Sequence, residues 1–101
     1  MTIQPASDQH LQAFLNSHPH WTVHNQKLHG QWVFENFVQA FAFMTAVALT
    51  AEAANHHPDW SNQYQRVTID LTTHEAGGIT QRDFELAEQI DRIVDHFQQG
   101  K

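Results

Sequence analysis

The sequence predicts an α+β domain, with the element order helix, two strands, helix, two strands, helix. Apolar residues alternate with polar ones in 21–34 and again in 67–72, which is typical of strands with one buried face. The stretch 37–55 contains no Gly or Pro and is rich in Ala, Phe and Leu, which favours a long helix. Because the strands have a polar outer side, we expect helices to cover one face of the sheet only. We expect the 101 residues to form one domain, 1–101.

The first elements are a short helix and a hairpin. Ser7 can cap a helix over about residues 8–17, and Pro19 prevents its continuation. The polar pair Asn25–Gln26 then separates two alternating stretches. This pattern predicts a two-stranded hairpin with one buried face.

The stretch 37–55 is apolar around most of its circumference, and Asn36 can cap it. A helix of this length is roughly 28 Å long, and an all-round apolar surface requires burial on two sides. We expect the second side to form a subunit contact, in a homodimer or a homotetramer. A membrane span is the alternative, but the polar residues and an otherwise hydrophilic chain argue against it. The polar residues after the cap are Gln39, Thr45, Thr50, Glu52 and Asn55.

The second half of the chain contains two strands and a last helix. Pro58 ends the long helix, and strands are expected over 60–64 and 67–71. After the break at Gly77–Gly78, the capping box Thr80-x-x-Asp83 opens a helix with one apolar face. The residues of that face are Leu86, Ile90, Ile93 and Phe97.

Composition excludes several classes of function. The net charge is −6, and the five Lys and Arg residues form no basic stripe, so direct nucleic-acid binding is not expected. The absence of cysteine excludes disulfides, thiolate nucleophiles and Cys-based zinc sites. The first residues lack the basic and apolar regions of a signal peptide, so we expect a cytoplasmic protein.

Histidine is the candidate for chemistry, because the chain has nine and an unperturbed imidazole has a pKa of about 6.5. His56 and His57 are followed by Pro58 and preceded by Glu52. Glu52 and His56 are four residues apart, so we expect both on one face of the last helical turn. The helix C-terminus favours a protonated imidazole, which could act as an acid.

Two longer patterns surround these histidines. The first is Phe34-x-x-Phe37-x-x-Ala40-x-x-Phe43-Met44-x-x-Val47-Ala48-x-x-Ala51-Glu52-x-x-Asn55-His56-His57-Pro58-x-Trp60. The second is Tyr64-x-x-Val67-x-Ile69-x-Leu71-x-Thr73-His74-x-x-x-Gly78-Ile79-Thr80-x-x-Asp83. In order and spacing, residues 30–95 resemble the pterin carbinolamine dehydratases.

The resemblance implies a fold and an activity. The fold is a two-layer, four-stranded antiparallel sheet with helices on one face, assembled into dimers and tetramers. The activity is the loss of water from a 4a-hydroxytetrahydropterin, which gives the quinonoid dihydropterin in tetrahydrobiopterin recycling. This reaction needs no cofactor and no metal. The resemblance leaves open which pterin side chain is accepted.

The resemblance also assigns roles. His56 and His74 are expected to transfer protons, while His57 binds the ring or takes part in one stereochemical course; which residue is acid and which is base stays open. Glu52 is expected to hold a substrate N–H or to favour the charged form of His56, and Trp60 to form an apolar wall. Asp83 could have only a structural role in the capping box. The residues expected to bind substrate are Glu52, Pro58, Trp60, Thr73 and Asp83.

Two other classes of function compete with this interpretation. A metal-binding hydrolase could use the same histidines with Glu52 and Asp83 as ligands, although the chain contains no His-Glu-x-x-His element. The other hypothesis is a non-enzymatic binding module, since family members act as dimerisation cofactors of a transcription factor. That role would use an exposed helix surface rather than the histidines.

Overall fold

The computed structural model describes residues 3–98 as three α-helices, one short 3₁₀ turn and four strands. The strands form one antiparallel sheet in the order β1-β2-β4-β3, so the predicted α+β fold and its element order are confirmed. The elements are α1 (Asp8–Ser17), β1 (Thr22–His24), β2 (Lys27–Val33), α2 (Phe37–Ala54), β3 (Asp59–Gln63), β4 (Arg66–Leu71), η1 (His74–Ala76) and α3 (Gln81–Gln98).

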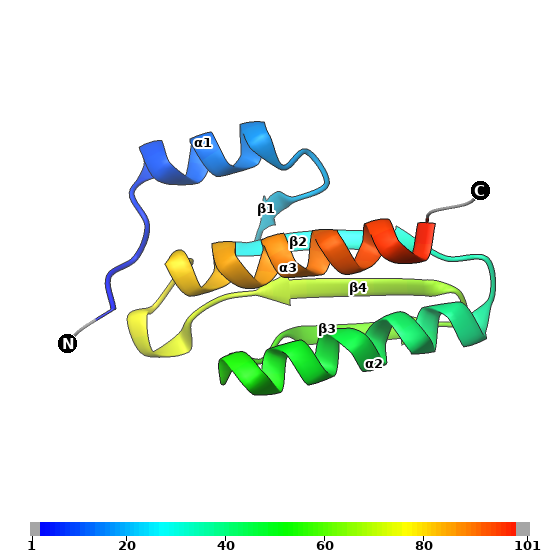
Figure 1. Cartoon of the computed structure of the whole chain (residues 1–101). Coiled ribbons are helices and arrows are strands. Elements are labelled where there is room, and N and C mark those ends of the chain that lie inside the picture. Colours follow the sequence, from blue (N-terminus) through cyan, green and yellow to red (C-terminus); the bar gives the residue numbers. More distant parts are fainter. Residues whose placement is uncertain (1–2, 99–101) are drawn as a thin grey trace.

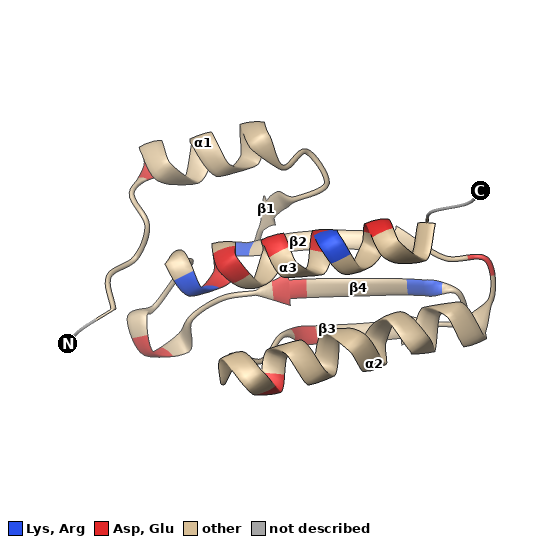
Figure 2. Ribbon diagram, in the orientation of Figure 1, with Lys and Arg blue, Asp and Glu red and all other residues tan. Residues whose placement is uncertain are grey.

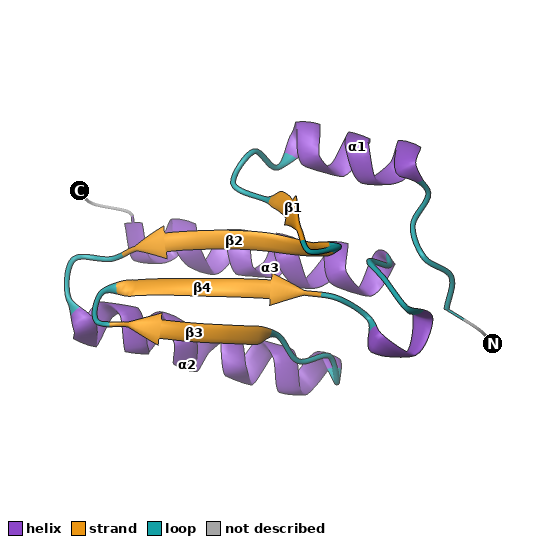
Figure 3. Cartoon of the chain, turned by 180° about the vertical axis from the view of Figure 1, so that it is seen from behind, coloured by secondary structure: helices purple, strands orange, loops and turns teal. Residues whose placement is uncertain are grey.

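Helices α2 and α3 lie side by side on one face of the sheet (Figure 1). Figure 3 shows the opposite face, where no helix covers the strands. Helix α1 lies beyond the edge strand β1 and contacts α3 through Phe14 and Phe84, whose ring centroids are 4.6 Å apart. The prediction of a sheet that helices cover on one side is therefore confirmed.

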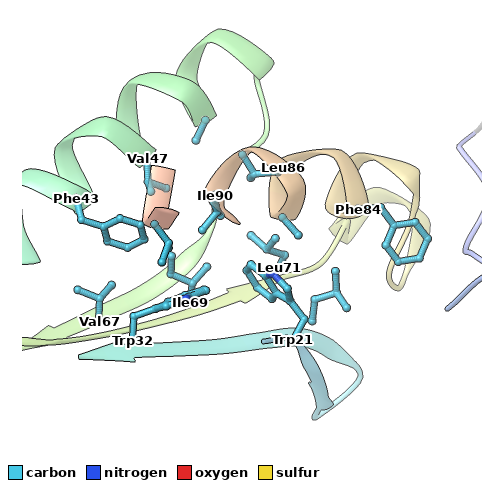
Figure 4. Packing of buried hydrophobic residues seen from close by; sticks show 14 of the residues in the cluster. Trp21, Trp32, Phe43, Val47, Val67, Ile69, Leu71, Phe84, Leu86 and Ile90 are labelled. Carbon is cyan, nitrogen blue, oxygen red and sulfur yellow. The ribbon is translucent and has the colours of Figure 1, made fainter. Parts of the chain in front are cut away.

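The core fills the space between α2, α3 and the inner face of the sheet (Figure 4). Alternate residues of β2 and β4 point into it, as the period of two requires. Gly30 makes room for the indole of Trp32, because a Cβ at that position would lie 2.4 Å from Trp32 Cη2. Its members include, from the sheet, Leu28, Trp32, Val67, Ile69 and Leu71, and, from the helices, Phe43, Val47, Leu86 and Ile90.

Helix α2 is capped by Asn36, whose side chain accepts from the backbone N–H of Gln39 at 2.9 Å. Its inner face is buried, whereas apolar residues on its outer surface are exposed within the single chain. By length and composition α2 could cross a membrane, but its inner face is part of the core of the sheet and helix layers. The inner residues are Ala40, Phe43, Val47 and Ala51, and the outer ones are Phe37, Val38, Phe41 and Leu49.

Both hairpins have two-residue turns that need a left-handed backbone. Asn25 and Gln26 have φ angles of 52° and 64°, between the paired residues His24 and Lys27. At the other end of the sheet, Tyr64 has a φ of 56° and lies in the β3–β4 turn rather than in the predicted strand 60–64. The β1–β2 turn is the one that lies beside the predicted histidine site.

Candidate active site

Three histidines from two parts of the chain line one cavity of about 170 Å³. His56 and His57 follow the end of α2, and His74 begins the η1 turn after β4. The cavity is also lined by Asn55, Thr72 and Glu75. The structure thus brings together the three histidines that the sequence singled out.

His56 is buried, with 8% of its surface exposed. Its Nε2 lies 2.6 Å from Oδ1 of Asp83. An ionised carboxylate can only accept hydrogen bonds, so Nε2 carries the hydrogen in this contact. Nδ1 is therefore the ring atom of His56 that remains to exchange a proton.

Asp83 is fully buried and accepts three hydrogen bonds. Oδ2 accepts from Thr73 Oγ1 at 2.9 Å and from the backbone N–H of Thr80 at 2.8 Å. Because Thr73 gives its one hydroxyl hydrogen to Asp83, the 2.7 Å contact between the two threonine hydroxyls requires Thr80 to donate. Both carboxylate oxygens of Asp83 and both threonine hydroxyls have partners, so the network holds Nε2 of His56 in one place.

The predicted capping box is present, and its carboxylate, that of Asp83, also contacts His56. Thr80 Oγ1 accepts from the backbone N–H of Arg82 at 3.2 Å, while Asp83 returns a bond to the N–H of Thr80. Thr73 and Asp83 were expected to bind substrate, yet both have no exposed surface. They lie behind His56 and act on a ligand only through its ring.

Glu52 pairs with His57 and not with His56. The Glu52 Oε1 to His57 Nε2 distance is 2.9 Å, and both side chains are mostly exposed. The prediction that Glu52 and His56 share a helical face is wrong, because Asn55 takes a left-handed conformation (φ 54°, ψ 41°) and ends the helix before His56. This turn directs His56 into the protein, where Asp83 meets it.

His74 is the most exposed of the three, with 77% of its side chain accessible. Its Nε2 lies 3.8 Å from Oδ2 of Asp59. Lys27 Nζ donates to the same oxygen at 2.9 Å, and this hydrogen bond raises the pKa of Lys27 above its usual value. Asp59, which the sequence patterns did not single out, therefore lies between a cation and an imidazole.

Pro58 and Trp60 are not among the residues that line the histidine cavity. Trp60 is partly buried against the core and lies opposite Ile69 on the inner face of the sheet. The lining residues that the sequence missed are Asn55, Thr72 and Glu75, each next to or within two residues of a predicted site residue. Asn55 is a position of the first sequence pattern, whereas for Thr72 and Glu75 the signal was their closeness in sequence to Thr73.

Within residues 3–98, no three His, Asp or Glu side chains are placed to hold a metal ion. The described part of the chain thus offers no ligand set to the metal-hydrolase alternative. The arrangement suits proton transfer: one imidazole is fixed by a buried carboxylate, and two others share the cavity and contact solvent.

The family model of the pterin 4 alpha carbinolamine dehydratases matches residues 4–93. The chain belongs to this family. A protein of Solibacter usitatus (strain Ellin6076), provisionally named pterin-4-alpha-carbinolamine dehydratase, is 54% identical over 88 residues, 87% of this chain and 93% of its own length. One of Prochlorococcus marinus (strain MIT 9303) with the same provisional name is 52% identical over 93 residues, 92% of this chain and 97% of its own.

Two solved structures share the fold. A crystal structure titled transcriptional coactivator/pterin dehydratase, from Brucella melitensis, superimposes with a TM-score of 0.86 at 30% identity, covering 89% of this chain and 98% of that one. A pterin dehydratase-like protein identified as a RuBisCO assembly factor in the alpha-carboxysome gives 0.66 at 22% identity, over 76% and 92% of the two chains. The family that the motifs resembled is therefore confirmed.

Proposed function

We propose that this protein removes water from a 4a-hydroxytetrahydropterin and gives the quinonoid dihydropterin, as a step in tetrahydrobiopterin recycling. His56, His57 and His74 exchange the protons. The observation that carries the proposal is the single cavity shared by these three imidazoles in a member of the pterin carbinolamine dehydratase family.

The reaction needs one proton given and one taken. A carbon–oxygen bond breaks as the hydroxyl leaves, as water, with a proton from an acid. The neighbouring ring nitrogen loses its proton to a base as the carbon–nitrogen double bond forms. Each positioned acid or base contributes typically about 10²–10⁴-fold to the rate. Near neutral pH an imidazole can either donate or accept a proton, so the histidines of the cavity can supply both the acid and the base.

The buried histidine, His56, and the two exposed ones, His57 and His74, suit different proton-transfer steps of the reaction. His56 is held by Asp83 in one tautomer, so its Nδ1 accepts a proton when the ring is neutral and donates one when it is charged. His57 and His74 are exposed enough to exchange protons with solvent between turnovers. Asp83 and Thr73 are positioning residues in this mechanism.

We also propose that the active protein is a homo-oligomer. The outer surface of α2 exposes Val38, Phe41 and Leu49 at 74%, 57% and 70% of their area. Glu52 is the one charged residue of α2, and Figure 2 shows the red of an acidic residue near the C-terminal end of this helix. A second copy of the chain would remove this apolar surface from water, which stabilises the assembly.

The experiment that tests the function follows a carbinolamine pterin, freshly generated in solution, by its absorbance with and without the protein. The proposal expects dehydration to accelerate in proportion to protein concentration. A rate equal to the uncatalysed one at every protein concentration would refute it.

A further inference from the structure

Lys27 and Asp59 form an ion pair that crosses β4 on the face of the sheet that no helix covers (Figure 3). Lys27 is the first residue of β2 and Asp59 the first of β3, and these two strands flank β4. Asp59 is paired in register with Asp70, which alternates with the buried residues of β4. The ion pair therefore lies at the end of β4 from which the chain leads to His74.

The side chain of His74 reaches back to this ion pair. Its Nε2 lies 3.8 Å from Oδ2 of Asp59, the oxygen that accepts from Lys27 Nζ at 2.9 Å. A distance of 3.8 Å is too long for a hydrogen bond, so the contact is an attraction between charges that exists only while the imidazole is protonated. The side chains of His74 and Asp59 are 77% and 50% exposed, so water and salt weaken this attraction.

The other ionisable groups around His74 have partners of their own. Within residues 3–98, Asp59 is the one carboxylate that lies within ion-pair distance of the His74 ring. Glu75, the next residue in the chain, faces the guanidinium of Arg82 at 3.5 Å. The charge beside His74 is therefore set mainly by Asp59 and by the lysine bonded to it. Other pairs in this region are His29 with Asp70, His56 with Asp83 and His57 with Glu52.

We propose that Asp59 is a positioning residue that stabilises the protonated form of His74, and that Lys27 limits this effect by bonding to the same oxygen. The inference rests on the proposed function, because the protonated ring matters only if His74 exchanges protons with the substrate. A carboxylate beside an imidazole favours the charged ring, and an ammonium beside it disfavours that form. Lys27 and Asp59 together balance the two forms between which His74 must alternate.

The test follows the ring carbon–hydrogen signals of His74 by NMR between about pH 5 and pH 9, at low ionic strength, where the imidazole titrates. The decisive variants are Asp59→Asn and Lys27→Met, and Asp59→Glu restores the charge. The hydrogen bond to Asp59 raises the pKa of Lys27, so the ammonium keeps its charge over this range. The matched control is Glu35→Gln, which removes an exposed carboxylate at the opposite end of the sheet. The initial rate of dehydration is measured over the same range.

We expect the midpoint of the His74 titration to move to lower pH by about half a pH unit in Asp59→Asn, because a negative charge beside the ring is lost. In Lys27→Met the midpoint should move to higher pH, since a positive charge is lost and Asp59 can turn to the ring. Asp59→Glu should restore most of the wild-type midpoint, and the control should leave it unchanged. The limb of the pH–rate profile that depends on His74 should move in the same two directions.

The signs of the shifts separate an electrostatic role from a purely structural one, because a general loosening of the site would move both variants the same way. An unchanged midpoint in Asp59→Asn, or shifts of the same sign in Asp59→Asn and Lys27→Met, would overturn the inference while wild-type turnover sustains the function. Opposite shifts in a protein without turnover would support the effect of Asp59 on His74 and refute the dehydratase function. Opposite shifts with a pH–rate profile that does not move would overturn the role of the ion pair in the reaction.

Discussion

The imidazole of His56 and the carboxylate of Asp83 meet at 2.6 Å, although the two residues are 27 positions apart in the sequence. The contact joins the end of α2 to the first turn of α3. It gives the most buried of the three histidines a fixed orientation beside the cavity.

Asp83→Asn should reduce both stability and activity. The amide keeps the size of the side chain but replaces one acceptor oxygen by a donor, so one of the three donors around it loses its partner. A buried unsatisfied group costs about 1–3 kcal/mol, and we expect the free energy of unfolding in urea to fall by that amount. The dehydration rate should fall too, since the ring of His56 is no longer held. An unfolding free energy equal to that of the wild type would contradict the network as described.

Asp91→Asn should stabilise the protein at neutral pH. Burial raises the pKa of Asp91 above its usual 3.8, and the hydrogen bond from Trp21 Nε1 at 2.9 Å only partly opposes this. The folded state thus holds the proton more tightly than the unfolded state, so stability falls as pH rises from about 4 through the raised pKa. Asparagine keeps an oxygen for Trp21 and cannot ionise.

The measurement is urea unfolding of Asp91→Asn and wild type at pH 4 and pH 7. We expect the variant to be the more stable at pH 7 and the difference to shrink toward pH 4. Glu35→Gln, which changes an exposed carboxylate, is the control and should show little difference at either pH. If the variant is less stable than the wild type at pH 7, the charge of Asp91 stabilises the folded state and the prediction is wrong.

Phe41→Glu should dissociate the oligomer without unfolding the chain. Phe41 is 57% exposed on the outer surface of α2, so the single chain loses little packing, whereas a subunit contact would bury a charge. Sedimentation velocity at micromolar concentration should show a wild type larger than the 11.6 kDa chain and a variant shifted toward it. Gln12→Glu on α1 adds the same charge elsewhere and should leave the assembly unchanged. A wild type that sediments as the single chain would refute the proposed assembly.

The three helices and the order of the strands were predictable because most of these elements have a local signal. Caps at Ser7 and Asn36 and the breaks at Pro19 and Pro58 bound the first two helices, and alternation marks β2 and β4. The buried face predicted for the whole hairpin is wrong for β1, whose three residues are all exposed. The Thr80-x-x-Asp83 capping box is also a local pattern, and the structure contains it. These interactions span a few residues, so sequence spacing is enough to reveal them.

The hydrogen bonds between the site residues were not predictable in the same way. Asp83 also contacts His56, which follows the end of α2. No rule of sequence spacing connects these two residues, because they meet only after the sheet and helices have packed. The error over Glu52 had a local cause: helical spacing was extended through Asn55, although asparagine at a helix end often takes the left-handed conformation that stops it.

The most direct test of the shared histidine site is the initial rate of dehydration by His74→Ala. The side chain is 77% exposed, so its removal should change the free energy of unfolding by less than about 0.5 kcal/mol. His10→Ala, an exposed histidine on α1, is the matched control and should keep the wild-type rate. We predict a loss of about 10²–10⁴-fold for His74→Ala at unchanged stability. A His74→Ala protein that dehydrates the carbinolamine at the wild-type rate would contradict the account.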